Sequence, residues 1–115
     1  MATIYWKGGT NQSPTTQANW VTASGGDTAI DDTTFNGGNL SAHDVVLEYR
    51  GNNGLVISGA TTFNSITISY HAHSSYSGIL TVLQNQTLTL NRLTVKKANS
   101  IGSDASPAII KFVGS

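Results

Sequence analysis

Apolar and polar residues alternate with a period of two in several short stretches of this chain. Ser65-Ile66-Thr67-Ile68-Ser69 places two isoleucines on one face and three hydroxyls on the other, the pattern of a half-buried β-strand. Six further segments are predicted as strands: Asp44–Arg50, Leu55–Ile57, Ile79–Val82, Thr87–Leu90, Leu93–Val95 and Ala108–Val113. No segment repeats apolar residues at helical spacing, so the pattern predicts little helix.

The connections between these strands carry turn signals. Gly51-Asn52-Asn53-Gly54 predicts a tight turn before Leu55. Leu90 and Leu93 are an odd number of residues apart and cannot both point inward along one straight strand, so we predict a bend, bulge or corner at Asn91-Arg92. Asparagine tolerates the left-handed backbone that such corners often use.

Two segments lack periodicity and are predicted as mostly irregular. The first runs from Thr22 to Ser41, with Phe35 and Leu40 as possible anchors, and the second from Ala98 to Pro107. Loops of the first length are uncommon in compact domains unless they have a function. The loop Thr22–Ala42 is therefore a candidate attachment segment.

The short strands predict an all-β fold. We expect a short β-helix-like solenoid with an N-terminal cap that contains tryptophan, and a β-sandwich or jelly roll is the alternative. The chain could form only about two to three coils of about 20 to 25 residues, so it would need oligomerisation, a partner surface or a longer parent chain. We expect one β domain, with a cap and loop region over 1–43 and a short-strand region over 44–115.

Composition and charge reduce the number of function classes to consider. Only 10% of the 115 residues are charged, against about 25% in typical domains, and six acidic side chains balance six basic ones. The basic residues are scattered apart from Lys96-Lys97, which argues against nucleic acid as a partner. The N-terminus lacks the features of a signal peptide, and no apolar run approaches the roughly 20 residues of a membrane span. We predict no membrane partner and assembly in a cytoplasm.

Both tryptophans lie within the first twenty residues. Tyr5-Trp6-Lys7-Gly8-Gly9 is followed by Ala18-Asn19-Trp20, so this segment is predicted to form a packed cap and not a flexible leader.

The opening motif also carries a family resemblance. With Ser24-Gly25-Gly26 and Asp31-Asp32-Thr33-Thr34-Phe35, it resembles the start of a group of tailed-phage virion structural proteins. Ser65–Ser69, Gly78–Val82 and Leu88–Leu90 resemble strands that follow in that group, so the likeness spans roughly residues 3 to 95. The run Thr33–Gly38 departs from the group's pattern, because an aliphatic strand does not follow Asp32 directly.

The resemblance implies a non-enzymatic virion protein. Capsid decoration (cement) proteins, head fibres and tail fibres all belong to the group, and we expect a cement protein or a capsid-attached head-fibre base that bridges capsid subunits. The expected partners are the major capsid protein or other virion proteins. The chain is also expected to form a homo-oligomer, for which a trimer is one option. The candidate partner-binding residues are Trp6, Trp20, Phe35 and Leu40. The two tryptophans could instead fill the core of the cap. A chain end soon after a strand also makes Ser115 a plausible truncation point.

A tail-fibre or tailspike fragment that binds host-surface glycan is the alternative function. Tyr49, Tyr70 and Tyr76 could form a sugar-binding face, because aromatic rings stack on sugars and neighbouring amides bond hydroxyls. The same tyrosines could instead form packing pairs on a β-surface.

Metal binding and catalysis have weak signals. His71 and His73 would share a face of an extended segment, with His43 or Asp44 as a third ligand, but the segment also fits an exposed loop. The six carboxylates show no spacing typical of a glycosidase pair: Asp27, Asp31, Asp32, Asp44, Glu48 and Asp104. We predict no enzyme activity, no catalytic residues, no metal site and no cofactor.

Overall fold

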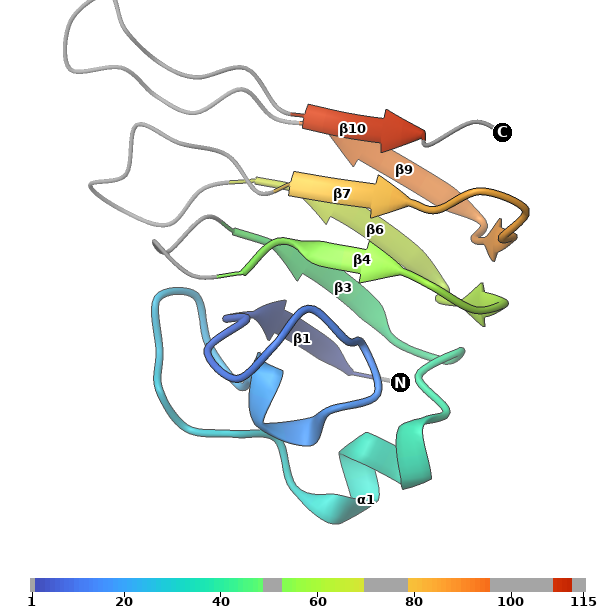
Figure 1. Cartoon of the computed structure of the whole chain (residues 1–115). Helices are drawn as coiled ribbons and strands as arrows, with labels where there is room; N and C mark the ends of the chain where they lie inside the picture. The colour runs from blue at the N-terminus through green and yellow to red at the C-terminus, as the bar shows by residue number, and fades with distance from the viewer. Residues whose placement is uncertain (1, 49–52, 70–78, 96–108, 113–115) are drawn as a thin grey trace, which may run out of the picture.

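A computed structural model describes residues 2–48, 53–69 and 79–95, together with the backbone of 109–112 (Figure 1). The described residues are mostly short strands with one short helix, which confirms the all-β prediction. The strands are β1 Thr3–Trp6, β2 Trp20–Val21, β3 Asp44–Leu47, β4 Leu55–Ile57, β5 Thr61–Thr62, β6 Ser65–Ile68, β7 Ile79–Val82, β8 Leu88–Thr89, β9 Arg92–Val95 and β10 Ile109–Phe112. The helix is α1, Asp32–Phe35, and 3-10 turns span Gln17–Asn19 and Asn36–Gly38.

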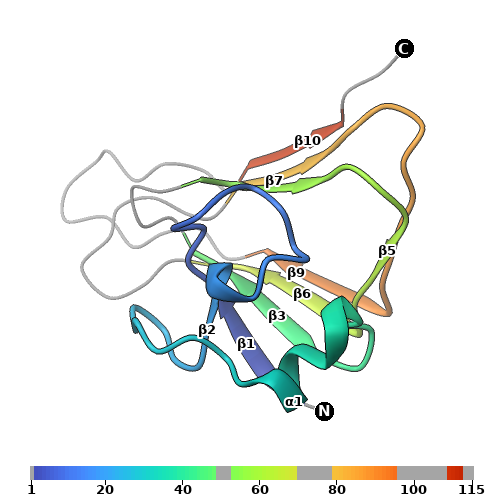
Figure 2. The same cartoon turned by 60° about the horizontal axis from the view of Figure 1, so that its bottom comes forward.

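The strands form three sheets that are parallel except at β2. The five-stranded sheet has the order β2-β1-β3-β6-β9, the three-stranded sheet β10-β7-β4, and the two-stranded sheet β5-β8. From β3 onward the chain visits the five-, three- and two-stranded sheets in turn and returns to the same sheet at every third strand. Figure 2 shows β1, β3, β6 and β9 as one wall, with β7 and β10 opposite and β5 at the side.

Strand register stacks equivalent residues on one another along the five-stranded sheet. Position 45 pairs with position 66, which pairs with position 93. The buried columns of this sheet are Ile4, Val45 and Ile66, and Trp6, Leu47 and Ile68. Leu55 pairs with Leu80 and Ile57 with Val82 on the facing sheet, so one apolar core fills the space between the sheets.

The alternation identified most strands and misplaced some ends. β7 spans the predicted Ile79–Val82, whereas β3 ends at Leu47 and β8 holds only Leu88–Thr89. The strand Thr3–Trp6 was missed, because its tryptophan was assigned only to a cap. It extends the five-stranded sheet by pairing in parallel with β3.

The predicted corner between Leu90 and Leu93 exists, but its backbone is not the expected one. Among the described residues with side chains, left-handed φ angles occur at Asn36 and Asn85 and not at Asn91. The backbone N–H of Asn91 donates to the Asn64 carbonyl at 3.0 Å, and its Nδ2 donates to Asn64 Oδ1 at 2.9 Å. Stacked asparagines, and not a left-handed residue, therefore hold this corner.

The segment predicted as loop, Thr22–Ser41, contains α1, the one α-helix in the part of the chain that the structure describes. The Asp31 carboxylate accepts the Thr34 backbone N–H at 2.8 Å as an N-cap, and Asn36 ends the helix with a φ of 52°. The predicted turn at 51–54 lies partly, and the irregular segment 98–107 wholly, outside the described residues.

Candidate functional site

The two tryptophans fill the closed end of the stack. Trp6 and Trp20 are 1% and 0% exposed, and their rings meet edge to face with centroids 4.9 Å apart. Phe63 packs on Trp20 with centroids 6.0 Å apart. Each indole N–H has a carbonyl partner, since Trp6 Nε1 donates to Asn53 O at 2.7 Å and Trp20 Nε1 to Pro14 O at 2.8 Å. Both rings are therefore packed in the core, as predicted for this segment.

Asn19 holds the loop that covers these rings. Its side chain is fully buried; Oδ1 accepts the backbone N–H groups of Thr10 at 3.0 Å and Asn11 at 3.2 Å. Its Nδ2 donates to Asn11 Oδ1 and to the Ser13 carbonyl. Both N–H donors of the amide and its acceptor oxygen are therefore satisfied inside the loop, which explains why asparagine precedes Trp20.

Gly8 of the opening motif is required by a close backbone approach. Its φ is +65°, and a Cβ there would lie 2.2 Å from the Asn53 carbonyl oxygen. The Gly8 carbonyl accepts the backbone N–H of Asn53 at 3.1 Å and its Nδ2 at 2.8 Å. Gln12 O likewise accepts the N–H of Val56 at 3.0 Å, so the loop from Gly8 to Gln12 covers the free edge of β4.

The Ser24-Gly25-Gly26 element is tied to the stack by a buried carboxylate. Glu48 is 3% exposed; it accepts hydrogen bonds from the Ser24 hydroxyl and, at 3.2 Å, from the Gly25 backbone N–H. A buried carboxylate needs such donors to offset its desolvation. Several residues of the motif behind the phage resemblance therefore have structural contacts at this end: Trp6, Gly8, Asn19, Trp20, Ser24 and Gly25.

This placement bears on the candidate partner-binding residues. Trp6 and Trp20 are buried and Leu40 is 4% exposed, so these side chains offer little surface to a partner. Phe35 is half-buried against the same core. Of the two alternatives for the tryptophans, the core alternative is the one observed. The glycan candidates Tyr49, Tyr70 and Tyr76 lie outside the described residues.

Of the residues in the metal hypothesis, the structure describes His43 and Asp44, and both form hydrogen bonds within the protein. His43 Nδ1 accepts the Ala2 backbone N–H at 3.1 Å, which leaves the proton on Nε2 to donate to the Thr34 carbonyl at 2.7 Å. His71 and His73 lie outside the described residues. Over 2–48, 53–69 and 79–95, no three His, Cys, Asp or Glu side chains gather as they would around a metal ion.

The described carboxylates have structural partners. Asp27 forms an ion pair with Lys7 at 3.0 Å, and Asp31 caps α1, whose Thr34 backbone N–H lowers the pKa of that carboxyl. The Ser65 hydroxyl and the Asn64 amide bond Asp44 Oδ1 at 2.6 and 2.8 Å. The Ser65 bond is the largest cause of a lowered Asp44 pKa, and the nearby charge of Arg92 adds to it. Asp104 lies outside the described residues.

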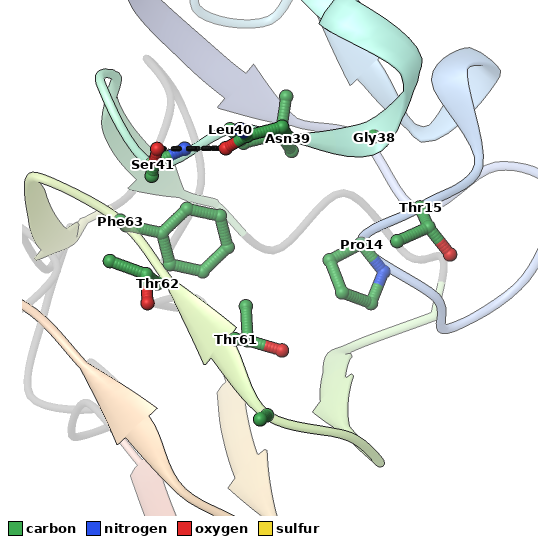
Figure 3. A pocket seen from close by; sticks show the side chains of 10 residues that line it. Pro14, Thr15, Gly38, Asn39, Leu40, Ser41, Thr61, Thr62 and Phe63 are labelled. Carbon is green, nitrogen blue, oxygen red and sulfur yellow. Dashed lines mark hydrogen bonds between the residues drawn. The ribbon is translucent and has the colours of Figure 1, made fainter.

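Two surface hollows have polar residues in their lining. Figure 3 shows the first, between Pro14 and Thr15 on one side and Thr61 and Phe63 on the other. Its volume is about 300 Å³. A second, of about 380 Å³, lies on the outer face of the five-stranded sheet, and Asp44, Asn64, Asn91 and Arg92 are among the residues that line it.

The end of the stack opposite the tryptophans exposes its core residues. Leu93 and Val95 on β9 are 46% and 51% exposed, whereas Ile66 and Ile68, which pair with them on β6, are fully buried. A groove of about 340 Å³ lies beside Leu93. The other residues that line this groove are Leu80, Val82, Gln86, Thr87, Leu88 and Leu90. We call this region, β9 with its groove, the open end.

Sequence reasoning found the tryptophans but missed most of their partners. Pro14, Asn53 and Phe63 had no signal of their own, because each contacts the cap through the fold and not through a pattern. Arg92 was noted only as part of a corner. Its position on the outer face of a strand could have been anticipated from the alternation Arg92-Leu93-Thr94-Val95.

Comparisons with known proteins found no matching family model, no matching curated protein and no matching solved structure. Among the described residues, the structure contains no helix with the length and apolar character needed to span a membrane.

Proposed function

We propose that this chain is a non-enzymatic structural protein of a tailed-phage virion, either a capsid decoration protein or the capsid-attached base of a head fibre. The observation that carries the proposal is the closed end. The residues that resemble the phage group are the ones that build it, through Trp6, Gly8, Asn19, Trp20 and the Ser24–Glu48 bond.

We propose the corresponding fold, a short β-helix-like solenoid with a tryptophan cap. Three sheets of parallel strands, visited in a fixed order, support a solenoid over a sandwich, because sandwich sheets are antiparallel. A stack that is sealed at one end and apolar at the other suits a small module seated on a larger assembly. The mechanism would be bridging, in which each copy adds binding free energy that the shell loses on rupture.

A glycan-binding tail-fibre fragment is the second candidate. The polar groove around Asp44, Asn64 and Arg92 favours it, since amides, hydroxyls and charged groups of this kind bond sugar hydroxyls.

Deletion of this gene from the phage that encodes it distinguishes the decoration function from the glycan-binding function. Under the decoration proposal, particles that lack the protein break at lower temperature or under osmotic shock but still adsorb to cells. If the shells keep their strength and adsorption is lost, the glycan-binding function replaces the decoration proposal.

A further inference from the structure

We propose that the edge of β9 accepts a parallel strand from another virion protein. Four successive residues of that strand are an acidic residue, an aliphatic residue, a residue of any type and a second aliphatic residue. The inference rests on the proposed function for the source of the strand. It makes the open end, and not the tryptophan end, the attachment surface.

The backbone of β9 is available for such pairing. β9 is the last strand of the five-stranded sheet, so the N–H and C=O groups that face away from β6 have no neighbouring strand among the described residues. From β1 to β9 this sheet is parallel and in register, so a further parallel strand continues it without changing its geometry. Strand addition to an exposed edge is a common mode of peptide recognition.

The inner face of β9 fixes the two aliphatic positions. Leu93 and Val95 continue the columns of Ile66 and Ile68, yet they are about half exposed where those residues are fully buried. An added strand would place one aliphatic side chain over each of them, at positions two residues apart. The groove beside Leu93, lined by Leu80, Leu88 and Leu90, gives these side chains an apolar wall.

The outer face fixes the acidic position. Arg92 occupies the column of Asp44 and Ser65, points to the exposed side, and forms no salt bridge within the described residues. A residue added in register beside it would be its cross-strand neighbour, where an opposite charge is favourable and a like charge is not. Charge complementarity therefore selects Asp or Glu.

A second copy of this chain does not fit the same edge. Its β3, Asp44-Val45-Val46-Leu47, has the required pattern but is paired on both sides, with β1 and β6. The far edge of its sheet is covered by β2, whose Val21 bridges to Ala29. Among the described residues its one open edge in this sheet is β9 itself, Arg92-Leu93-Thr94-Val95, which has arginine where the proposed pattern requires an acidic residue.

Fluorescence anisotropy with labelled peptides and the purified 115-residue chain tests the proposal. The probe is Thr-Asp-Val-Thr-Val-Thr with blocked ends, and the matched control has Lys in place of Asp. We expect saturable binding of the Asp peptide and about two- to fivefold weaker binding of the Lys peptide. Arg92→Glu should reverse this preference. Leu93→Lys should weaken binding roughly tenfold, while Leu83→Lys, at an exposed leucine outside the groove, should leave it unchanged.

Three results would overturn the inference: no saturable binding up to about 1 mM peptide, equal binding of both peptides, or binding unaffected by Leu93→Lys. A concentration-dependent dimer in sedimentation that Leu93→Lys abolishes would assign the edge to a second copy instead, and a longer parent chain whose next strand pairs with β9 would assign it to this chain itself. Because the assay contains no virions, its failure leaves the virion role intact, and loss of the virion role leaves the peptide result standing.

Discussion

Asn19 shows how one buried polar side chain can organise an entire loop. Its amide bonds Thr10, Asn11 and Ser13, and its own carbonyl accepts the backbone N–H groups of Lys7 and Gly8. Buried polar groups carry a high cost when they lose a partner, so this residue is more sensitive to substitution than its polarity implies. The tryptophan rings lie beneath the loop that it holds.

Asn19→Ala is expected to lower the free energy of unfolding by about 2 kcal/mol, because two backbone N–H groups lose their acceptor. Denaturant unfolding followed by tryptophan fluorescence measures it. The exposed Asn39→Ala serves as control and should change stability by less than about 1 kcal/mol. Equal effects of both substitutions would contradict the role given to Asn19.

Asp44 predicts a pH dependence of stability. Its pKa is lowered from 3.8 by the bond from Ser65 and then by that from Asn64. Ionised Asp44 therefore adds stability above pH 3.8, and this contribution is lost as the pH falls through the lower folded value. Asp44→Asn should flatten the acid limb of unfolding free energy against pH, and Ser65→Ala should flatten it partly. Acid limbs parallel to that of the wild type would contradict this assignment.

At the scale of the element, each strand of the five-stranded sheet is defined by its place in a column. Ile68 and Val95 occupy the same column on adjacent strands, yet one is fully buried and the other is 51% exposed. The alternation of the sequence is the same in both strands. Only the presence of a strand on the far side distinguishes them.

The column predicts unequal costs for the same kind of truncation. Ile68→Ala should destabilise the chain by about 2 to 5 kcal/mol, because Ile68 is fully buried and its truncation opens a cavity in the core. Val95→Ala should cost less than about 1 kcal/mol, since its side chain is half in water already. Thermal or denaturant unfolding of the two variants compares them. Similar losses would mean that the open end is covered in solution.

Strand positions could be predicted from the sequence where inward and outward residues differ in polarity, as in Ser65–Ile68 and Ile79–Val82. The parallel pairing could not, because the register depends on which distant strands meet, and the alternation is equally compatible with antiparallel neighbours. The same distinction between local pattern and distant contacts applies to the N-terminal segment. Its tryptophans were evident from their size, whereas Asn53, Pro14 and Glu48 join it through contacts between distant segments.

At the scale of the whole molecule, the two ends of the stack differ in kind. One end carries a loop, a buried indole pair and a buried carboxylate bond. The other carries exposed aliphatic residues and a strand edge that has no neighbouring strand among the described residues. The proposed attachment follows from this asymmetry. A particle that carries the protein should hold it by the open end, with the tryptophan cap facing away.

The most direct test of the virion role is a cryo-EM difference map between particles of the encoding phage with and without this gene. The account predicts ordered extra density on the capsid surface, into which the three-sheet stack fits with β9 against a capsid subunit and the Trp6–Trp20 cap toward solvent. Identical capsid maps, with the protein absent from purified particles by mass spectrometry, would contradict it.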